Sequence, residues 1–209
     1  MHERYLIEAS NLSRRFGKSR IFRGISFSVE SGECFFITGP NGSGKSTLVQ
    51  IIAGLQKPSE GKLAIKLNGK EILESLWSHI GFASPAMNLY ERLTVYENAS
   101  FAFRGKDKSL INQYISLFGL GKHKDKEARI LSSGLRQRLR LITAMINSPG
   151  IVLLDEPGSN LDVEGKDVLF REIEKIKKES LVIIASNDPE ELKLCHKGID
   201  LAKQNSRPH

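Results

Sequence analysis

A glycine-rich loop between an apolar run and a helical pattern is the feature that most constrains this chain. Residues 39–46 read Gly-Pro-Asn-Gly-Ser-Gly-Lys-Ser and match the pattern G-x-x-x-x-G-K-[ST] in full. The apolar run 34–38 precedes the loop, and Leu48, Ile51, Ile52 and Leu55 follow it at helical spacing. Strand, loop and helix in this order form the context that a phosphate-binding loop requires.

The residue types of this loop suit a phosphate ligand. Glycines allow consecutive backbone N–H groups to turn inward around phosphate oxygens, and the following helix adds the positive end of its dipole. Lys45 is expected to reach the β- and γ-phosphates of a nucleotide, and the Ser46 hydroxyl is expected to ligate Mg²⁺. The predicted nucleotide-binding residues of the loop are Gly39, Pro40, Asn41, Gly42, Ser43, Gly44, Lys45, Ser46 and Thr47.

A second motif places two acids at the end of another apolar run. Residues 151–157 read Ile-Val-Leu-Leu-Asp-Glu-Pro. A strand here would place Asp155 where it can hold Mg²⁺ through water, and Glu156 where it can polarise an attacking water. An ordinary strand-to-loop transition can have the same pattern, but acids seldom end a buried strand without a task. Combined with the loop, this motif predicts a nucleotide site in which Lys45 and Glu156 are catalytic.

The spacing of apolar residues predicts one α/β domain. The expected strands lie at 5–10, 26–29, 34–38, 62–67, 151–154 and 181–185. The last two read as fully buried strands, which is typical of a parallel sheet covered on both faces, and Leu169, Ile173 and Ile176 mark a crossover helix between them. A polar tail from about Lys203 is expected to fray.

The middle of the chain has a different character. From 77 to 149, apolar residues fall mostly at helical spacing, which predicts an inserted helical subdomain. Residues 1–76 and 150–209 are then expected to form the core and an N-terminal β subdomain, within a single domain of 209 residues.

Composition narrows the setting further. No run approaches the ~18 apolar residues of a membrane-spanning helix, and the N-terminus lacks the apolar core of a secretory signal. Cys34 and Cys195 make no disulfide framework, so we expect reduced cysteines and a cytoplasmic protein. The net charge is +7, but no aromatic residues interleave the scattered basic ones, and a nucleic-acid partner is not favoured.

With these motifs in place, the chain resembles the ATP-binding cassette (ABC) ATPase family over nearly its whole length. Residues 131–138, Leu-Ser-Ser-Gly-Leu-Arg-Gln-Arg, look like the family signature, and residues 159–162, Ser-Asn-Leu-Asp, look like its D-loop. Phe16 occupies the place of the aromatic residue that stacks on adenine. Residues 93–98, Leu-Thr-Val-Tyr-Glu-Asn, are similar to the segment that opens the family's helical subdomain.

The resemblance implies a P-loop NTPase fold: a mostly parallel sheet core, an N-terminal antiparallel β subdomain and an inserted helical subdomain. It also implies ATP and Mg²⁺ as ligands and a head-to-tail homodimer that sandwiches ATP. In that dimer Ser132, Ser133 and Gly134 of one chain bind the nucleotide held by the other, and Ser132 contributes to catalysis. A serine that opens a helix offers a hydroxyl and free N–H groups, although an ordinary N-cap serine has the same local geometry.

The chain departs from the family pattern at several positions. The signature has Ser133 in place of a glycine and Leu135 in place of a glutamine. A serine Cβ hinders close approach of the backbone to phosphate if the position needs positive φ. Pro85 stands where the family has a glutamine that serves as a side-chain ligand, and the neighbouring Ser84 offers a hydroxyl. Asn187 stands where the family has its catalytic switch histidine. The Asn187 amide can donate to phosphate or water but cannot become cationic.

These observations predict a slow but active ATPase, because the phosphate loop and both acids are present and positioning does most of the work in phosphoryl transfer. The predicted function is the ATP-binding and ATP-hydrolysing subunit of a compact exporter-type ABC transporter. It would drive a transmembrane permease on a separate chain from the inner face of the membrane.

The alternatives are a soluble ABC protein that acts as an ATP-gated clamp or assembly factor, and a pseudoenzyme that binds ATP as a switch. An unrelated phosphate-loop kinase or GTPase is the weakest alternative, because no guanine-reading N-K-x-D stretch occurs and the signature would go unexplained.

Overall fold

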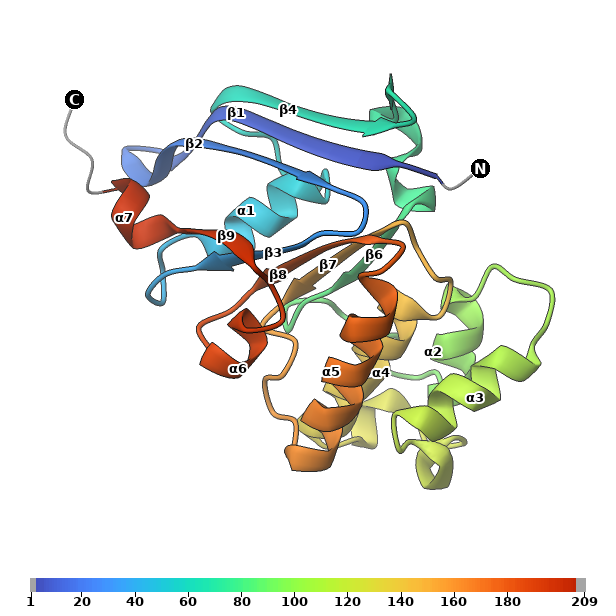
Figure 1. The fold of residues 1–209 in the computed structure, drawn as a ribbon. Coiled ribbons are helices and arrows are strands. Elements are labelled where there is room, and N and C mark those ends of the chain that lie inside the picture. Colours follow the sequence, from blue (N-terminus) through green and yellow to red (C-terminus); the bar gives the residue numbers. More distant parts are fainter. Residues whose placement is uncertain (1–2, 206–209) are drawn as a thin grey trace.

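Two β-sheets and two groups of helices form the layers of the molecule in the computed structural model, which describes residues 3–205 (Figure 1). The antiparallel sheet has the order β2-β1-β4-β5, and the parallel sheet has the order β6-β7-β8-β3-β9. The strands are β1 Tyr5–Phe16, β2 Ser19–Glu30, β3 Cys34–Thr38, β4 Glu60–Leu67, β5 Lys70–Glu71, β6 Ile80–Ala83, β7 Ile151–Asp155, β8 Leu181–Ala185 and β9 Lys197–Asp200. The helices are α1 Lys45–Ile52, α2 Val95–Ala102, α3 Ser109–Leu117, α4 Ser133–Met145, α5 Val163–Ile176, α6 Pro189–Leu192 and α7 Leu201–Asn205, with 3-10 turns at Leu73–Ser78, Gly121–His123 and Ala128–Ile130.

Helix α1 lies between the two sheets (Figure 1). Its apolar residues share one core with the inner face of β1 and with every second residue of the parallel strands, such as Leu153 and Ile183. The intervening residues, such as Val152 and Ile184, pack on the other face against α4 and α5. Because both faces of β7 and β8 are covered, their sequences are continuously apolar. The predicted α/β fold class is confirmed.

The helical part of the chain follows β6. Helices α2, α3 and α4 all lie within residues 77–149, where an inserted helical subdomain was expected. The same range also contains β6, which pairs with β7 at the edge of the parallel sheet. The boundary at residue 77 therefore assigns one strand of the core sheet to the helical region. Helix α7 includes residue 203, where fraying was expected to begin, and residues 206–209 lie outside the described part.

The two cysteines correct an expectation from the sequence. Cys34 and Cys195 form a disulfide, although they are 161 residues apart and were expected to be reduced. The physical reason is the sheet order: β9 pairs with β3, so the turn before β9 brings Cys195 to the beginning of β3. Both residues are buried. Within residues 3–205, no helix has the length and apolar character needed to cross a bilayer.

The contact between β6 and α4 gives a test of the fold. A Cβ at Gly81 would lie 1.9 Å from the carbonyl oxygen of Ala144 and 2.6 Å from Pro149. We therefore expect Gly81→Ala to lower the free energy of unfolding by about 1–3 kcal/mol, since a packed interface resists added volume. Gly121→Ala is the control, because its Cβ would meet no atom within 4 Å. Chemical denaturation should separate the two variants, and equal stability would contradict this packing.

Candidate nucleotide-binding site

Three strands of the parallel sheet end at the same level and place the predicted motifs side by side. Ala185 at the end of β8 pairs with Ile37 of β3 on one side and with Asp155 of β7 on the other. The loop after β3, the acids after β7 and the segment after β8 therefore leave the sheet at one edge. In an open parallel sheet, ligands bind outside this carboxyl edge.

The glycines of the loop after β3 adopt conformations that other residues avoid. Gly39, Gly42 and Gly44 have φ of 143°, 81° and 99°. A Cβ on Gly39 would lie 2.8 Å from the Ser43 hydroxyl, and one on Gly44 would lie 2.5 Å from Ile21. Glycine is therefore required both by the backbone conformation and by the space available.

The loop fits a phosphate group. The buried Ser43 hydroxyl has no hydrogen-bond partner among the described residues, so this loop contains an unsatisfied polar atom. Gly44 caps α1 without a side-chain hydrogen bond, which leaves the helix N-terminus to an external acceptor. Lys45 is only 6% exposed, and its Nζ donates to the Gly39 carbonyl at 2.9 Å. Pro40 is exposed, and Thr47 is partly buried in the first turn of α1.

Asp155 is buried at the end of β7 and accepts two hydroxyl hydrogen bonds. Ser46 Oγ donates to Oδ1 at 3.0 Å, and Ser84 Oγ donates to Oδ2 at 2.9 Å. Burial raises the pKa of Asp155, while these two hydrogen bonds and the charge of Lys45 oppose the rise. The carboxylate and the Ser46 hydroxyl are oxygen donors of the kind that Mg²⁺ prefers. Within residues 3–205, no three or more His, Cys, Asp or Glu side chains gather into a group that could hold a metal ion.

Glu156 occupies a left-handed backbone conformation with φ of 48°. Its N–H donates to the carbonyl of Ala185 at 2.8 Å, and its carboxylate lies 3.7 Å from Lys45 Nζ. Burial raises the pKa of Glu156, and the positive charge of Lys45 lowers it in part. A carboxylate with a raised pKa at the mouth of the loop is suited to accept a proton from water.

Asn187 contacts the first part of the phosphate loop. Its Oδ1 accepts from the Gly39 N–H and from the Thr38 hydroxyl, both at 3.3 Å. Its Nδ2 donates to Asn41 Oδ1 at 3.2 Å. Asn187 therefore contacts the loop directly through a neutral amide.

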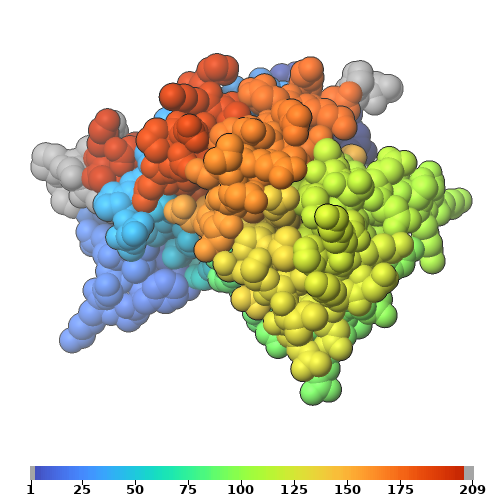
Figure 2. Space-filling model, turned by 90° about the horizontal axis from the view of Figure 1, so that it is seen from below, coloured from blue at the N-terminus to red at the C-terminus, as the bar shows by residue number. Residues whose placement is uncertain are grey.

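The other predicted residues belong to other elements. Phe16 ends β1 and is 48% exposed, with the Arg14 guanidinium 4.4 Å from the ring centroid. Ser132 caps α4, where its hydroxyl accepts from Leu135 N–H at 3.3 Å. The beginning of α4 belongs to the helical part, away from the loop that precedes α1 (Figure 1). Figure 2 shows a notch between the blue β1–β2 hairpin and this yellow and green helical part.

The serine in the signature adopts an ordinary backbone conformation. Ser133 is the first helical residue of α4 and is not among the residues with positive φ. Its Cβ therefore causes no backbone strain. Gly134 is constrained instead, because a Cβ there would lie 2.6 Å from the Asn160 carbonyl oxygen.

Comparison with known proteins agrees with this geometry. The family model described as ABC transporter matches residues 22–159. The chain belongs to the ABC transporter family.

The chain is similar in sequence to ATP-binding proteins that are named for the transport of different substrates. The chain is 36% identical over 181 residues to the spermidine/putrescine import ATP-binding protein PotA of Fusobacterium nucleatum, covering 83% of this chain and 48% of PotA. It is 30% identical over 184 residues to the lantibiotic transport ATP-binding protein SrtF of Streptococcus pyogenes, covering 87% and 80%. The chain spans about half the length of PotA and of the sulfate/thiosulfate import protein CysA that it also matches.

A solved structure shares the fold. The dimeric structure of MJ0796, a bacterial ABC transporter cassette, superposes with a TM-score of 0.81 at 25% identity and covers 93% of each chain. The expected P-loop NTPase architecture is therefore confirmed.

Two polar residues at this edge were not predicted as site residues, and one was considered only as a substitute. Ser84 was noted as the hydroxyl beside Pro85, and the structure places it against Asp155. Gln137 and Glu191 are almost fully buried and contact the loop that follows Glu156. For Gln137 a signal was present in the sequence, because this polar residue lies one turn before the apolar Leu141 on the buried face of α4.

Ser84 gives the first test of the site. Because its hydroxyl holds one oxygen of Asp155, we expect Ser84→Ala to raise the Mg²⁺ concentration needed for tight nucleotide binding by about tenfold, which is the usual cost of losing a partner of a metal-binding group. Nucleotide binding without Mg²⁺ should stay unchanged. The measurement is titration of a fluorescent ATP analogue at several Mg²⁺ concentrations. Ser75→Ala, at an exposed serine, is the control, and equal Mg²⁺ dependence in both variants would refute the role.

Proposed function

We propose that this chain binds and hydrolyses ATP as the nucleotide-binding subunit of an ABC transporter. The observation that carries the proposal is the convergence of Lys45, Ser46, Asp155 and Glu156 at one edge of the parallel sheet. Family membership supports it, and the relatives named as ATP-binding transport proteins agree with it.

The chain's own residues divide the chemistry among them. The turned N–H groups of residues 39–46 and the N-terminus of α1 bind the phosphates, and Lys45 neutralises their charge. Ser46 and Asp155 would hold Mg²⁺, which supplies positive charge to the phosphate oxygens when it is bound. Glu156 orients a water molecule and accepts its proton as the oxygen attacks the terminal phosphorus. The bond from that phosphorus to the bridging oxygen then breaks, and ADP and phosphate leave.

We infer that hydrolysis is slow. Asn187 can orient water or phosphate through its amide, but it offers no cation to the charge that develops. Pro85 has no side-chain ligand, and Ser84 contacts Asp155 instead. These replacements leave the phosphate loop intact, so they lower turnover more than nucleotide affinity.

We further propose that two copies associate head to tail around ATP. Phe16 and the phosphate loop belong to the core and β part, whereas Ser132, Ser133 and Gly134 belong to the helical part. A second copy turned through a two-fold axis would bring its α4 N-terminus to the loop. The dimeric cassette structure of similar fold supports this arrangement.

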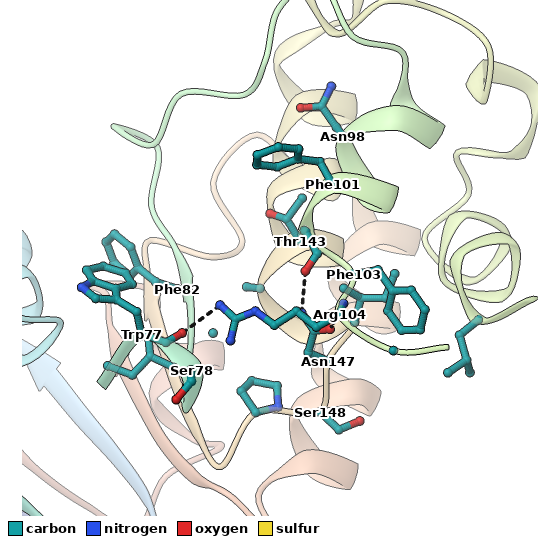
Figure 3. Close-up of a pocket in the computed structure, with 18 of the residues that line it drawn as sticks. Trp77, Ser78, Phe82, Asn98, Phe101, Phe103, Arg104, Thr143, Asn147 and Ser148 are labelled. Atoms are coloured by element: carbon teal, nitrogen blue, oxygen red, sulfur yellow. Dashed lines mark hydrogen bonds between the residues drawn. The ribbon is translucent and has the colours of Figure 1, made fainter. Parts of the chain in front are cut away.

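The partner that we propose is a transmembrane permease on a separate chain, with this subunit on the cytoplasmic face of the membrane. A groove of about 860 Å³ lies between β6 and helices α2 and α4. Its exposed aromatic residues include Trp77, Tyr90 and Phe101. Arg104 extends across the groove and donates from Nη2 to the Trp77 carbonyl at 2.9 Å (Figure 3). An apolar groove with a polar edge suits a short helix of the permease.

Steady-state phosphate release is the direct test of hydrolysis. We expect the parent chain to release phosphate slowly with Mg·ATP, and we expect Glu156→Gln to reduce the rate by about 100-fold, since the carboxylate that accepts the proton is lost. Asn187→His should raise the rate because imidazole can carry positive charge. Glu74→Gln, at an exposed acid, is the control.

Two other outcomes would change the proposal. Equal release by the parent and Glu156→Gln, with retained ATP binding and ATP-dependent association, would favour a non-hydrolysing clamp or switch. No ATP binding by the parent, compared with Lys45→Ala, would reject the nucleotide site altogether.

The groove is tested separately with inverted membrane vesicles from the source cells. We expect the chain to sediment with these vesicles and Phe101→Asp to reduce this binding about tenfold or more, since a charge would enter an apolar contact. Leu55→Asp is the control, because Leu55 is similarly exposed but lies outside the groove. Equal loss in both variants would show that the groove is not the contact.

A further inference from the structure

The loop that joins β7 to α5 has an unusual backbone immediately at Glu156. Glu156 and Asn160 have φ of 48° and 62°, the left-handed region that residues with a Cβ seldom adopt. Such a conformation persists only where the surroundings hold it, and it occurs often at functional sites. The contacts of residues 157 and 158 show what holds this one.

Gln137 holds the loop from the side of α4. Its Nε2 donates to the carbonyl of Pro157 at 2.9 Å and reaches the Glu156 carbonyl at 3.5 Å. The side chain of Gln137 is 1% exposed, so this amide is not a surface group. Gly134, one turn earlier on α4, lies against the Asn160 carbonyl.

Glu191 holds the same loop from the side of α6. Its Oε1 accepts from the Gly158 N–H at 2.8 Å, and Glu191 is 2% exposed. A Cβ on Gly158 would lie 2.2 Å from this oxygen, so the close approach requires glycine. Burial raises the pKa of Glu191. Ionising a buried carboxyl costs free energy, so a role in solubility does not explain a glutamate at this position.

The two contacts join parts of the site that are distant in the sequence. Glu191 lies four positions after Asn187, which contacts Gly39 and Asn41 of the phosphate loop. Gln137 lies on the helix that Ser132 caps. The loop that carries Glu156 is thus bound through the Gly158 N–H to residues 187–191 after β8, here called the switch segment. Its Glu156 and Pro157 carbonyls bind it to α4.

We propose that Glu191 and Gln137 are positioning residues that hold Glu156 in its left-handed turn. They contact neither the phosphate loop nor the Glu156 carboxylate in the hydrogen bonds of the described residues, and they act through the backbone of residues 156–158. Movement of either the switch segment or α4 would then displace Glu156. The proposal deepens the proposed ATPase function and rests on it for its kinetic consequence.

The test compares substitutions at Glu191 in the full chain. Glu191→Ala removes the acceptor for Gly158 N–H, Glu191→Gln keeps an acceptor oxygen at the same position, and Glu190→Ala is an exposed neighbouring control. We expect Glu191→Ala to lower kcat about tenfold or more with KM and ATP affinity changed less than about twofold, because only the position of the base is altered. Glu191→Gln should restore most of kcat. Gln137→Leu should resemble Glu191→Ala.

Amide hydrogen exchange gives a readout that does not need turnover. In Glu191→Ala, the peptide containing residues 157–161 should exchange faster, while peptides of α1 and β8 should be unchanged. Unaltered kcat or unaltered exchange in Glu191→Ala would overturn the proposal, as would a loss of ATP affinity equal to the loss of kcat. If the parent chain releases no phosphate, the proposed hydrolysis fails, but the exchange experiment still decides whether Glu191 holds the loop. Global unfolding would appear as faster exchange in all peptides, and Glu191→Gln then provides the comparison.

Discussion

The register of three parallel strands is the constraint on which the site depends. Ile37, Ala185 and Asp155 lie opposite one another in the register of β3, β8 and β7. Because side chains alternate between the two faces of a sheet, a slip of one residue in β7 would turn Asp155 to the opposite face. Such a slip would also exchange the residues that pack against α1 with those that pack against α4 and α5. The packing that stabilises the fold therefore also determines where the phosphate loop meets the acids.

The replacements that separate this chain from its family are accommodated without loss of the phosphate loop. Asn187 hydrogen-bonds to Gly39 and Asn41 in the first part of the loop through one amide. Ser84 gives Asp155 a second hydroxyl donor beside Pro85, which has none. Ser133 is an ordinary first residue of α4. Beside these replacements, Gly39, Gly42 and Gly44 of the phosphate loop keep the positive φ values that turn its backbone.

How well the sequence predicted a feature depends on how far apart along the chain its interacting residues lie. Residues 34–47 form a strand, a loop and the beginning of a helix within one continuous segment, and their pattern predicts that structure directly. β6 is a short apolar run inside a helical region, and its identity as a strand comes from pairing with β7, about 70 residues further on. The Cys34–Cys195 disulfide was missed because the neighbourhood of β3 and β9 has no local signal.

The sequence by itself determined the phosphate loop, the pair of acids and the family, because these depend on residue types at short spacing. The tertiary structure alone decided which polar side chains support them. Ser84 contacts Asp155 across 71 residues of sequence, and Glu191 contacts Gly158 across 33. Hydrogen bonds require their atoms within about 3 Å, and over such separations only the order of strands and the packing of helices bring them that close.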